Sequence, residues 1–175
     1  EFNRLKEEKK IPINADYERP TAEQVALTKL SAKKRLNDAK IRTANGGVVE
    51  VDLDRPLLGY SRRLVREKAG RNRAFTDDNI WKLVELGYNV VIMGYNQGEA
   101  SELLAAGLKG LEKNIAAEKA KRPNELPGKF QFVEAFTSQQ KKIFLAAEDV
   151  QVQDSDNHTG AAEFSEEDIT ANAGY

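Results

Sequence analysis

The segment from Asn89 to Gly94 constrains the fold most strongly, because it places four consecutive apolar residues, Val90 to Met93, between residues that interrupt regular structure. A run of this kind is typical of a strand buried on both faces of a parallel sheet. A capped helical pattern precedes it, from Thr76 to Gly87, and a longer one follows, from about Glu99 to Lys121. The segment therefore predicts an α/β fold in which helices connect parallel strands.

The same alternation continues on both sides of this segment. Thr21 and Gln24 have capping-box spacing and begin a helical pattern that runs to about residue 40. The remaining elements that we expect are strands at 48–53, 57–60, 129–135 and 149–153 and a helix at 138–147. Right-handed crossovers between such units give a Rossmann-like, mostly parallel sheet with helices on both faces. We expect the leucine-rich side of the longest helix to face the core, with Leu103, Leu104, Leu108, Leu111 and Ile115.

Length and charge limit the classes of protein that fit. The 175 residues suit a polar, extended lead-in over 1–20 and one domain over 21–175. With 27 basic and 28 acidic residues, the chain carries no global charge excess that favours nucleic acid or an anionic membrane. The absence of cysteine excludes disulfides, thiolate metal sites and cysteine nucleophiles, and no apolar run approaches the roughly 20 residues of a membrane span. We expect a cytoplasmic protein.

The two ends of the sequence suggest that it belongs to a longer polypeptide. It begins at Glu1 without a methionine, and it stops at Tyr175, just after a helical pattern. An α/β sequence would ordinarily continue there into another strand. We therefore expect the chain to be a fragment.

A cluster of cations follows the strand expected at 57–60. Four of them occur within seven residues, at Arg62, Arg63, Arg66 and Lys68. Ligands of α/β proteins usually bind in the crevice outside the carboxyl ends of the strands. Arg63 would offer a planar, bidentate fork there and Lys68 a compact charge, which together suit a phosphoryl or pyrophosphoryl group. The same charges would also suit a solvated loop.

The order of these parts resembles the C-terminal domain of two-domain (GT-B) glycosyltransferases, particularly the α-glucan phosphorylase and glycogen or starch synthase group. Ser61-Arg62-Arg63-Leu64 with Lys68 five residues after Arg63 is similar to the phosphate-binding segment of that group. Ala147, Asp149 and Val150 resemble its alanine-aspartate strand, and the segment from Thr159 to Gly174 is similar to its glycine-containing loop and helix. The resemblance covers roughly residues 48–175.

The resemblance implies a donor-side domain that binds a sugar phosphate or nucleotide sugar and acts on an α-glucan. Arg63 and Lys68 would be catalytic residues that hold the donor phosphate, and Thr159, Gly160 and Glu163 would bind substrate. An N-terminal partner domain, absent from this chain, would supply the acceptor side. No metal is implied.

One departure from the pattern bears on the cofactor and on catalysis. Phosphorylases carry a lysine in the final helix that forms an imine with pyridoxal phosphate, and Asp168 stands at the corresponding place. An aspartate cannot form that imine, so we expect no pyridoxal phosphate and no other cofactor. The acidic residue that usually binds the donor sugar also lacks a secure counterpart. A non-catalytic Rossmann-like module, used for binding or structure in a larger assembly, therefore remains the alternative.

Other polar residues allow two interpretations each. His158 could be a metal ligand or general base, or a solvated loop residue. The Asp154 to Asn157 segment is superficially similar to a calcium loop but lacks the glycine and glutamate positions. Glu134 could bind sugar hydroxyls or be an ordinary surface carboxylate. The turn from Gly94 to Glu99 could receive an anion on its backbone N–H groups, or reflect turn geometry alone.

Overall fold

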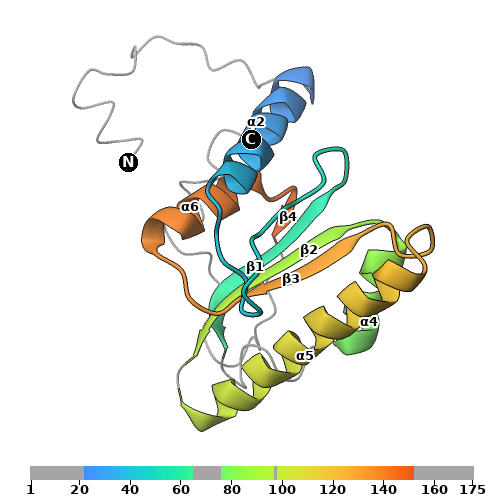
Figure 1. The fold of residues 1–175 in the computed structure, drawn as a ribbon. Coiled ribbons are helices and arrows are strands. Elements are labelled where there is room, and N and C mark those ends of the chain that lie inside the picture. The colour runs from blue at the N-terminus through green and yellow to red at the C-terminus, as the bar shows by residue number, and fades with distance from the viewer. Residues whose placement is uncertain (1–21, 65–75, 97, 152–175) are drawn as a thin grey trace, which may run out of the picture.

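The computed structural model describes residues 22–64, 76–96 and 98–151 (Figure 1). The elements in chain order are α2 (Ala22–Asp38), β1 (Leu57–Leu64), α4 (Asp77–Glu85), β2 (Asn89–Asn96), α5 (Glu99–Lys121), β3 (Lys129–Val133), α6 (Ser138–Ala147) and β4 (Val150–Gln151). The four strands form one sheet in the order β3-β2-β1-β4, and every neighbouring pair is parallel. The expected Rossmann-like α/β fold is confirmed.

The sheet lies between two helical layers, with α4 and α5 on one face and α2 and α6 on the other (Figure 1). Alternate residues of β2 enter the two cores, because successive side chains of a strand point to opposite faces. Val90 and Ile92 pack toward α4 and α5, whereas Val91 and Met93 pack toward α2 and α6. All four are at most 2% exposed, so β2 is buried on both faces, as the sequence predicts.

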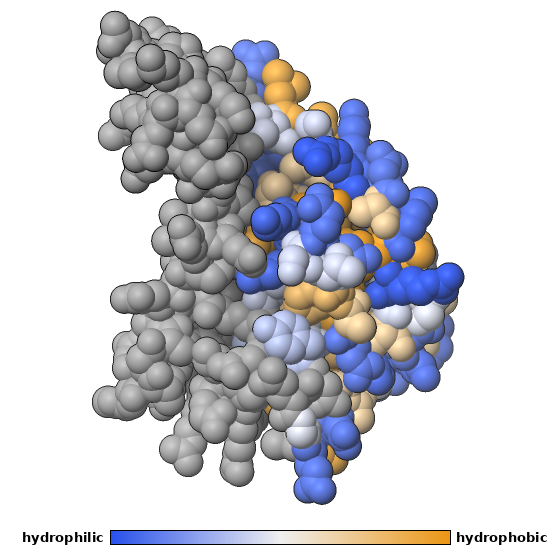
Figure 2. All heavy atoms as spheres, turned by 90° about the vertical axis from the view of Figure 1, so that its left-hand side faces the viewer, coloured by the Kyte–Doolittle hydropathy of each residue, from blue (hydrophilic) through white to orange (hydrophobic). Residues whose placement is uncertain are grey.

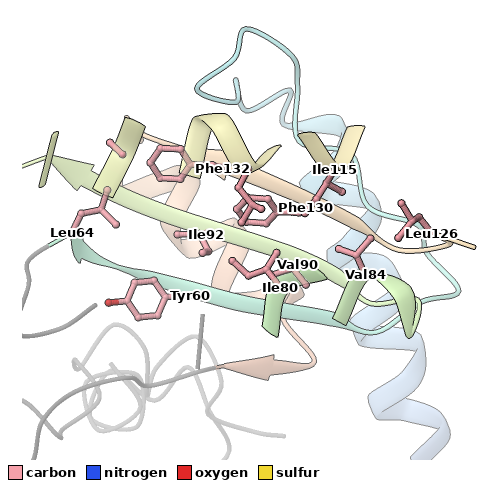
Figure 3. Packing of buried hydrophobic residues seen from close by; sticks show 12 residues of the cluster. Tyr60, Leu64, Ile80, Val84, Val90, Ile92, Ile115, Leu126, Phe130 and Phe132 are labelled. Atoms are coloured by element: carbon pink, nitrogen blue, oxygen red, sulfur yellow. The ribbon is translucent and has the colours of Figure 1, made fainter. Parts of the chain in front are cut away.

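The core beneath α4 and α5 is built from aliphatic and aromatic side chains of three strands and both helices (Figure 3). Ile80 and Val84 of α4 and Ala105 and Ile115 of α5 contribute to it and are each at most 2% exposed. Thr76 caps α4 by accepting a hydrogen bond from the Asn79 N–H, and Gly87 ends it with a φ of 91°. That left-handed conformation favours glycine.

Two expectations about local structure are wrong. Residues 48–53 do not form a strand, and only an isolated bridge joins Arg42 to Val48 across the Asn45-Gly46-Gly47 turn. Leu103 does not belong to the core, since it is 78% exposed near the start of α5. Leu103 lies on the outward side of α5, because Ser101 and Ala105, two residues before and after it, are each 1% exposed and take the inward side.

Residues 41–50 instead cover the outer edge of β3. The Ala44 N–H donates to the Phe132 carbonyl at 2.7 Å. The Gln131 side chain accepts from the Glu50 N–H and donates to the Val48 carbonyl. Hydrogen-bonding groups of an edge strand that would otherwise remain open are thereby satisfied.

Glu112 of α5 completes this edge. Its carboxylate is 8% exposed and accepts hydrogen bonds from the Asn45 and Thr43 side chains and from the Phe132 backbone. Burial nevertheless raises the pKa of Glu112 above the ordinary value, because desolvation of the charged form outweighs these hydrogen bonds. The side of β3 away from β2 is thus held by both backbone and side-chain contacts.

Candidate functional site

The strand order places the topological switch point between β1 and β4. From β1 the chain moves to β2 and β3 on one side, and then returns through α6 to β4 on the other side. Ligands of doubly wound sheets bind outside the carboxyl ends of the strands at such a point, where the connections diverge. A ligand-binding site in this sheet is therefore expected at the carboxyl end of β1.

Arg63 lies at that end of β1. The strand runs to Leu64, so the expectation of a strand over 57–60 followed by a loop at Arg62 and Arg63 is wrong: both arginines belong to the strand. Arg63 pairs in register with Tyr95 of β2. The side chains of Arg62 and Arg63 lie outside the described part of the structure.

The other residues predicted for the site also lie outside the described residues. They are Lys68, Thr159, Gly160, Glu163, His158 and Asp168. The convergence of Arg63 and Lys68 on one anion therefore stays a prediction.

An aromatic pair and an ion pair occupy the described part of the carboxyl edge beside β2 and β3. The rings of Tyr95 and Phe136 have centroids 5.4 Å apart and are tilted by 55°, a favourable arrangement of two aromatic rings. Glu134, which follows β3, forms a 2.6 Å ion pair with Lys109 of α5. Glu134 is thus engaged with a cation of its own chain, which favours the structural interpretation of this carboxylate.

The face of β1 toward α2 and α6 carries small residues and a buried carboxylate. Glu148, directly after α6, is 2% exposed, and its side chain lies against the backbone of Gly59. Any side chain at position 59 would overlap this carboxylate. Two residues further along the same face, Ser61 Oγ is buried and forms no hydrogen bond with the described part of the chain. Polar groups therefore continue from the middle of β1 toward its carboxyl end.

Two lysines of α2 hold the beginning of this face. Lys33 Nζ lies 2.6 Å from Asp149 Oδ2 and donates to the Arg55 carbonyl at 2.9 Å. The same Asp149 oxygen accepts from the Leu57 N–H at 2.7 Å. Lys29 Nζ donates to the carbonyl of Glu148 at 2.6 Å. The lysines thus join α2 to the start of β1 and to the segment between α6 and β4.

Burial lowers the pKa of Lys29, because desolvation of the ammonium outweighs the attraction of Asp149 and Glu148. Lys33 has a 7% exposed side chain and is held by the carboxylate of Asp149. Charges this deeply buried are stable only when they are paired and hydrogen-bonded. Among the described residues, Lys29, Lys33 and Asp149 thus hold β1 and β4 in place, and none of the three is a free reactive group.

Sequence reasoning missed this cluster, because it considered the apolar side chains of α2 and not its lysines. Leu27 is 60% exposed, whereas Lys33 and Leu36 are buried. The available signal was the spacing of Lys29, Lys33 and Leu36, which puts three residues on one helical face. Lysines are rarely buried, so this spacing alone does not predict that Lys33 faces inward.

The described residues hold no group of three or more histidine, aspartate or glutamate side chains that could bind a metal ion. None of the described helices combines the length and the apolar character that a bilayer span requires. Comparison with models of known protein families and with curated proteins gave no match. The chemistry of the site must therefore be inferred from the residues and the strand order.

Proposed function

We propose that the chain is the donor-side domain of an α-glucan glycosyl-transferring enzyme, which binds the phosphate of a sugar phosphate or nucleotide sugar. The observation that carries this proposal is the position of Arg63, the penultimate residue of β1, at the switch point of the sheet. An arginine at this point suits a bound phosphate, because the guanidinium forms two parallel, charge-assisted hydrogen bonds with it.

In this proposal Arg63 and Lys68 act as preorganised cations. The glucosyl carbon leaves the phosphate oxygen and bonds to an acceptor hydroxyl of the α-glucan, which gives up its proton. The electron pair of the broken bond stays on the phosphate oxygen, so negative charge grows there. Cations already in place stabilise this charge more in the transition state than in the ground state, which accelerates the step. Thr159 and Gly160 would offer backbone N–H groups to the phosphate or sugar, and Glu163 would bind sugar hydroxyls.

The buried cluster next to β1 supports this role indirectly. A phosphate-binding strand must stay in register while charge changes at its end, and a misplacement of about 1 Å can cost a hundredfold in rate. The Asp149 carboxylate, bound to the Leu57 N–H and to Lys33, anchors the start of this strand. α2 therefore serves as a support of the strand that carries Arg63.

The test is calorimetric titration of the full-length protein with glucose 1-phosphate and with nucleoside diphosphate sugars. Arg63→Ala and Lys68→Ala should each weaken binding by about 1.5–3 kcal/mol, the range for hydrogen bonds to charged groups. Arg63→Lys should restore only part of the affinity, since it keeps the charge but loses the fork. Lys113→Ala, at an exposed position of α5, removes the same charge and should leave binding unchanged.

Two results would contradict the proposal. One is equal weakening by Arg63→Ala and Lys113→Ala, which would mean a diffuse charge effect. The other is no measurable binding of either ligand class by the wild-type protein. That second result would favour the alternative, a Rossmann-like module with a binding or structural role in a larger assembly.

A further inference from the structure

A hollow lies between α2 and α6, on the helical layer away from α4 and α5. Its lining residues are Ala32 and Arg35 from α2 and Gln139, Lys142 and Ile143 from α6. Each group sits at helical spacing, so two facing helix surfaces form the walls. Figure 2 views the molecule from the side on which α6 lies in Figure 1, and hydrophilic side chains with apolar ones between them cover the described surface there.

The charge of the hollow is one-sided. Arg35 and Lys142 are both exposed cations, one from each helix, and the described lining residues include no carboxylate. Neither cation forms an ion pair with the described part of the chain. Lys33 and Lys29 of α2, by contrast, are engaged, since Lys33 binds Asp149 and Lys29 donates to the Ala146 and Glu148 carbonyls. The hollow thus carries two cations that form no ion pair with the described residues.

The first turn of α6 adds hydrogen-bond donors, which carry partial positive charge. Thr137 caps this helix by accepting the Gln140 N–H, and the Lys141 N–H donates to the Thr137 carbonyl. The backbone N–H groups that precede Gln140 in the first turn have no acceptor within the helix. The helix dipole places partial positive charge at this end of α6. Gln139 lies in that turn and also offers a side-chain amide to the hollow. Ala32 and Ile143 supply apolar surface between these polar groups.

We propose that this hollow binds a small organic phosphate, with Arg35 and Lys142 holding the phosphate group and Ala32 and Ile143 contacting its carbon skeleton. A phosphate between the cations would remove their mutual repulsion and form charge-assisted hydrogen bonds with both helices. The site lies on the helical layer and not at the carboxyl end of β1, so it is a second site, independent of the proposed donor site.

The experiment is a titration followed by two-dimensional amide and methyl NMR. Inorganic phosphate and glycerol 3-phosphate are the two probes, added at constant ionic strength so that general screening does not change. The Gln139 amide and the Ile143 methyl signals report on the hollow itself. Running the same titrations on Arg63→Ala separates this site from the proposed donor site.

The decisive variant is R35Q/K142Q, and its matched control is K34Q/K113Q, which removes two exposed lysines that do not line the hollow. We expect saturable shifts of the Gln139 and Ile143 signals in the wild type and in the control. In R35Q/K142Q the Kd should rise at least about tenfold, as expected when charged hydrogen bonds are lost. Both double variants change only exposed side chains and should unfold at the wild-type urea concentration.

Glycerol 3-phosphate should bind at least as tightly as inorganic phosphate, because only it reaches the apolar part of the hollow. Weaker binding of glycerol 3-phosphate would overturn the assignment to an organic phosphate. Equal loss in both double variants, or shifts spread over the whole chain, would show nonspecific anion accumulation and would overturn the site. The absence of any shift at Gln139 and Ile143 would overturn it as well. None of these results depends on whether Arg63 binds a donor phosphate.

Discussion

Replacing Gly59 with alanine tests whether the close contact of Glu148 with β1 determines the stability of the β1 and β4 junction. An ideal Cβ on Gly59 would lie 2.0 Å from Oε1 of Glu148, which falls about 1.4 Å short of the 3.4 Å where ordinary contact begins. Because Glu148 is 2% exposed, its carboxylate cannot move that far without displacing packed neighbours. We expect Gly59→Ala to lower the free energy of unfolding by about 2–3 kcal/mol, the upper part of the range for overpacking.

The assay is urea unfolding followed by the fluorescence of Trp81, the single tryptophan of the chain. Glu148→Ala provides the second arm of a double-mutant cycle, because it removes the Cγ and carboxylate atoms that the new methyl group would meet. In that background Gly59→Ala should cost less than about 0.5 kcal/mol, which gives a coupling energy of about 2 kcal/mol. If the two substitutions are additive, the carboxylate is not what excludes a side chain at position 59, and the reasoning fails.

Three further outcomes follow from described contacts. Gly107→Ala in α5 should raise the free energy of unfolding by about 0.5–1 kcal/mol in urea titration, because a Cβ there meets nothing within 4 Å and alanine favours the helix; a loss would contradict this. Lys33→Met should lower the free energy of unfolding by about 2 kcal/mol, since it strips Asp149 of its cation, and a change below about 0.5 kcal/mol would mean that water replaces the lysine. Burial raises the pKa of Glu112, so the unfolded chain ionises first as pH rises from about 4.5 and wild-type stability falls until the folded-state pKa is passed. Glu112→Gln should remove this fall, and urea midpoints measured between about pH 4 and 7 for both proteins would show it as a wild-type midpoint that falls relative to that of the variant as pH rises; parallel curves would refute it.

The elements with strong local signals could be predicted from the sequence. The α5 and α6 helices begin and end where breakers and caps stand, and β2 is recognised by its uninterrupted apolar run. The parallel arrangement follows from alternation alone, because strands joined through helices must run the same way. The position of β4 beside β1, and with it the switch point, did not follow from any local pattern.

Features that depend on long-range contacts could not be predicted from the sequence. The valines at 48, 49 and 51 have strand propensity, yet the preceding turn directs them along the edge of β3 and they join no ladder. The burial of Lys33 depends on Asp149, which lies more than a hundred residues later in the sequence and forms an ion pair with it. The arginines at the end of β1 were assigned to a loop, because the apolar run of the strand stops at Tyr60 and a cationic stretch follows.

The cover over the outer edge of β3 restricts how this sheet can be extended. The Phe132 carbonyl is already occupied by Ala44, and Glu112 binds the backbone of the same residue. An incoming strand, whether from the same polypeptide or from a neighbouring molecule, would first have to strip off residues 41–50. The β3 side of the sheet is therefore closed to a further strand, and two copies of this chain cannot pair through their β3 edges.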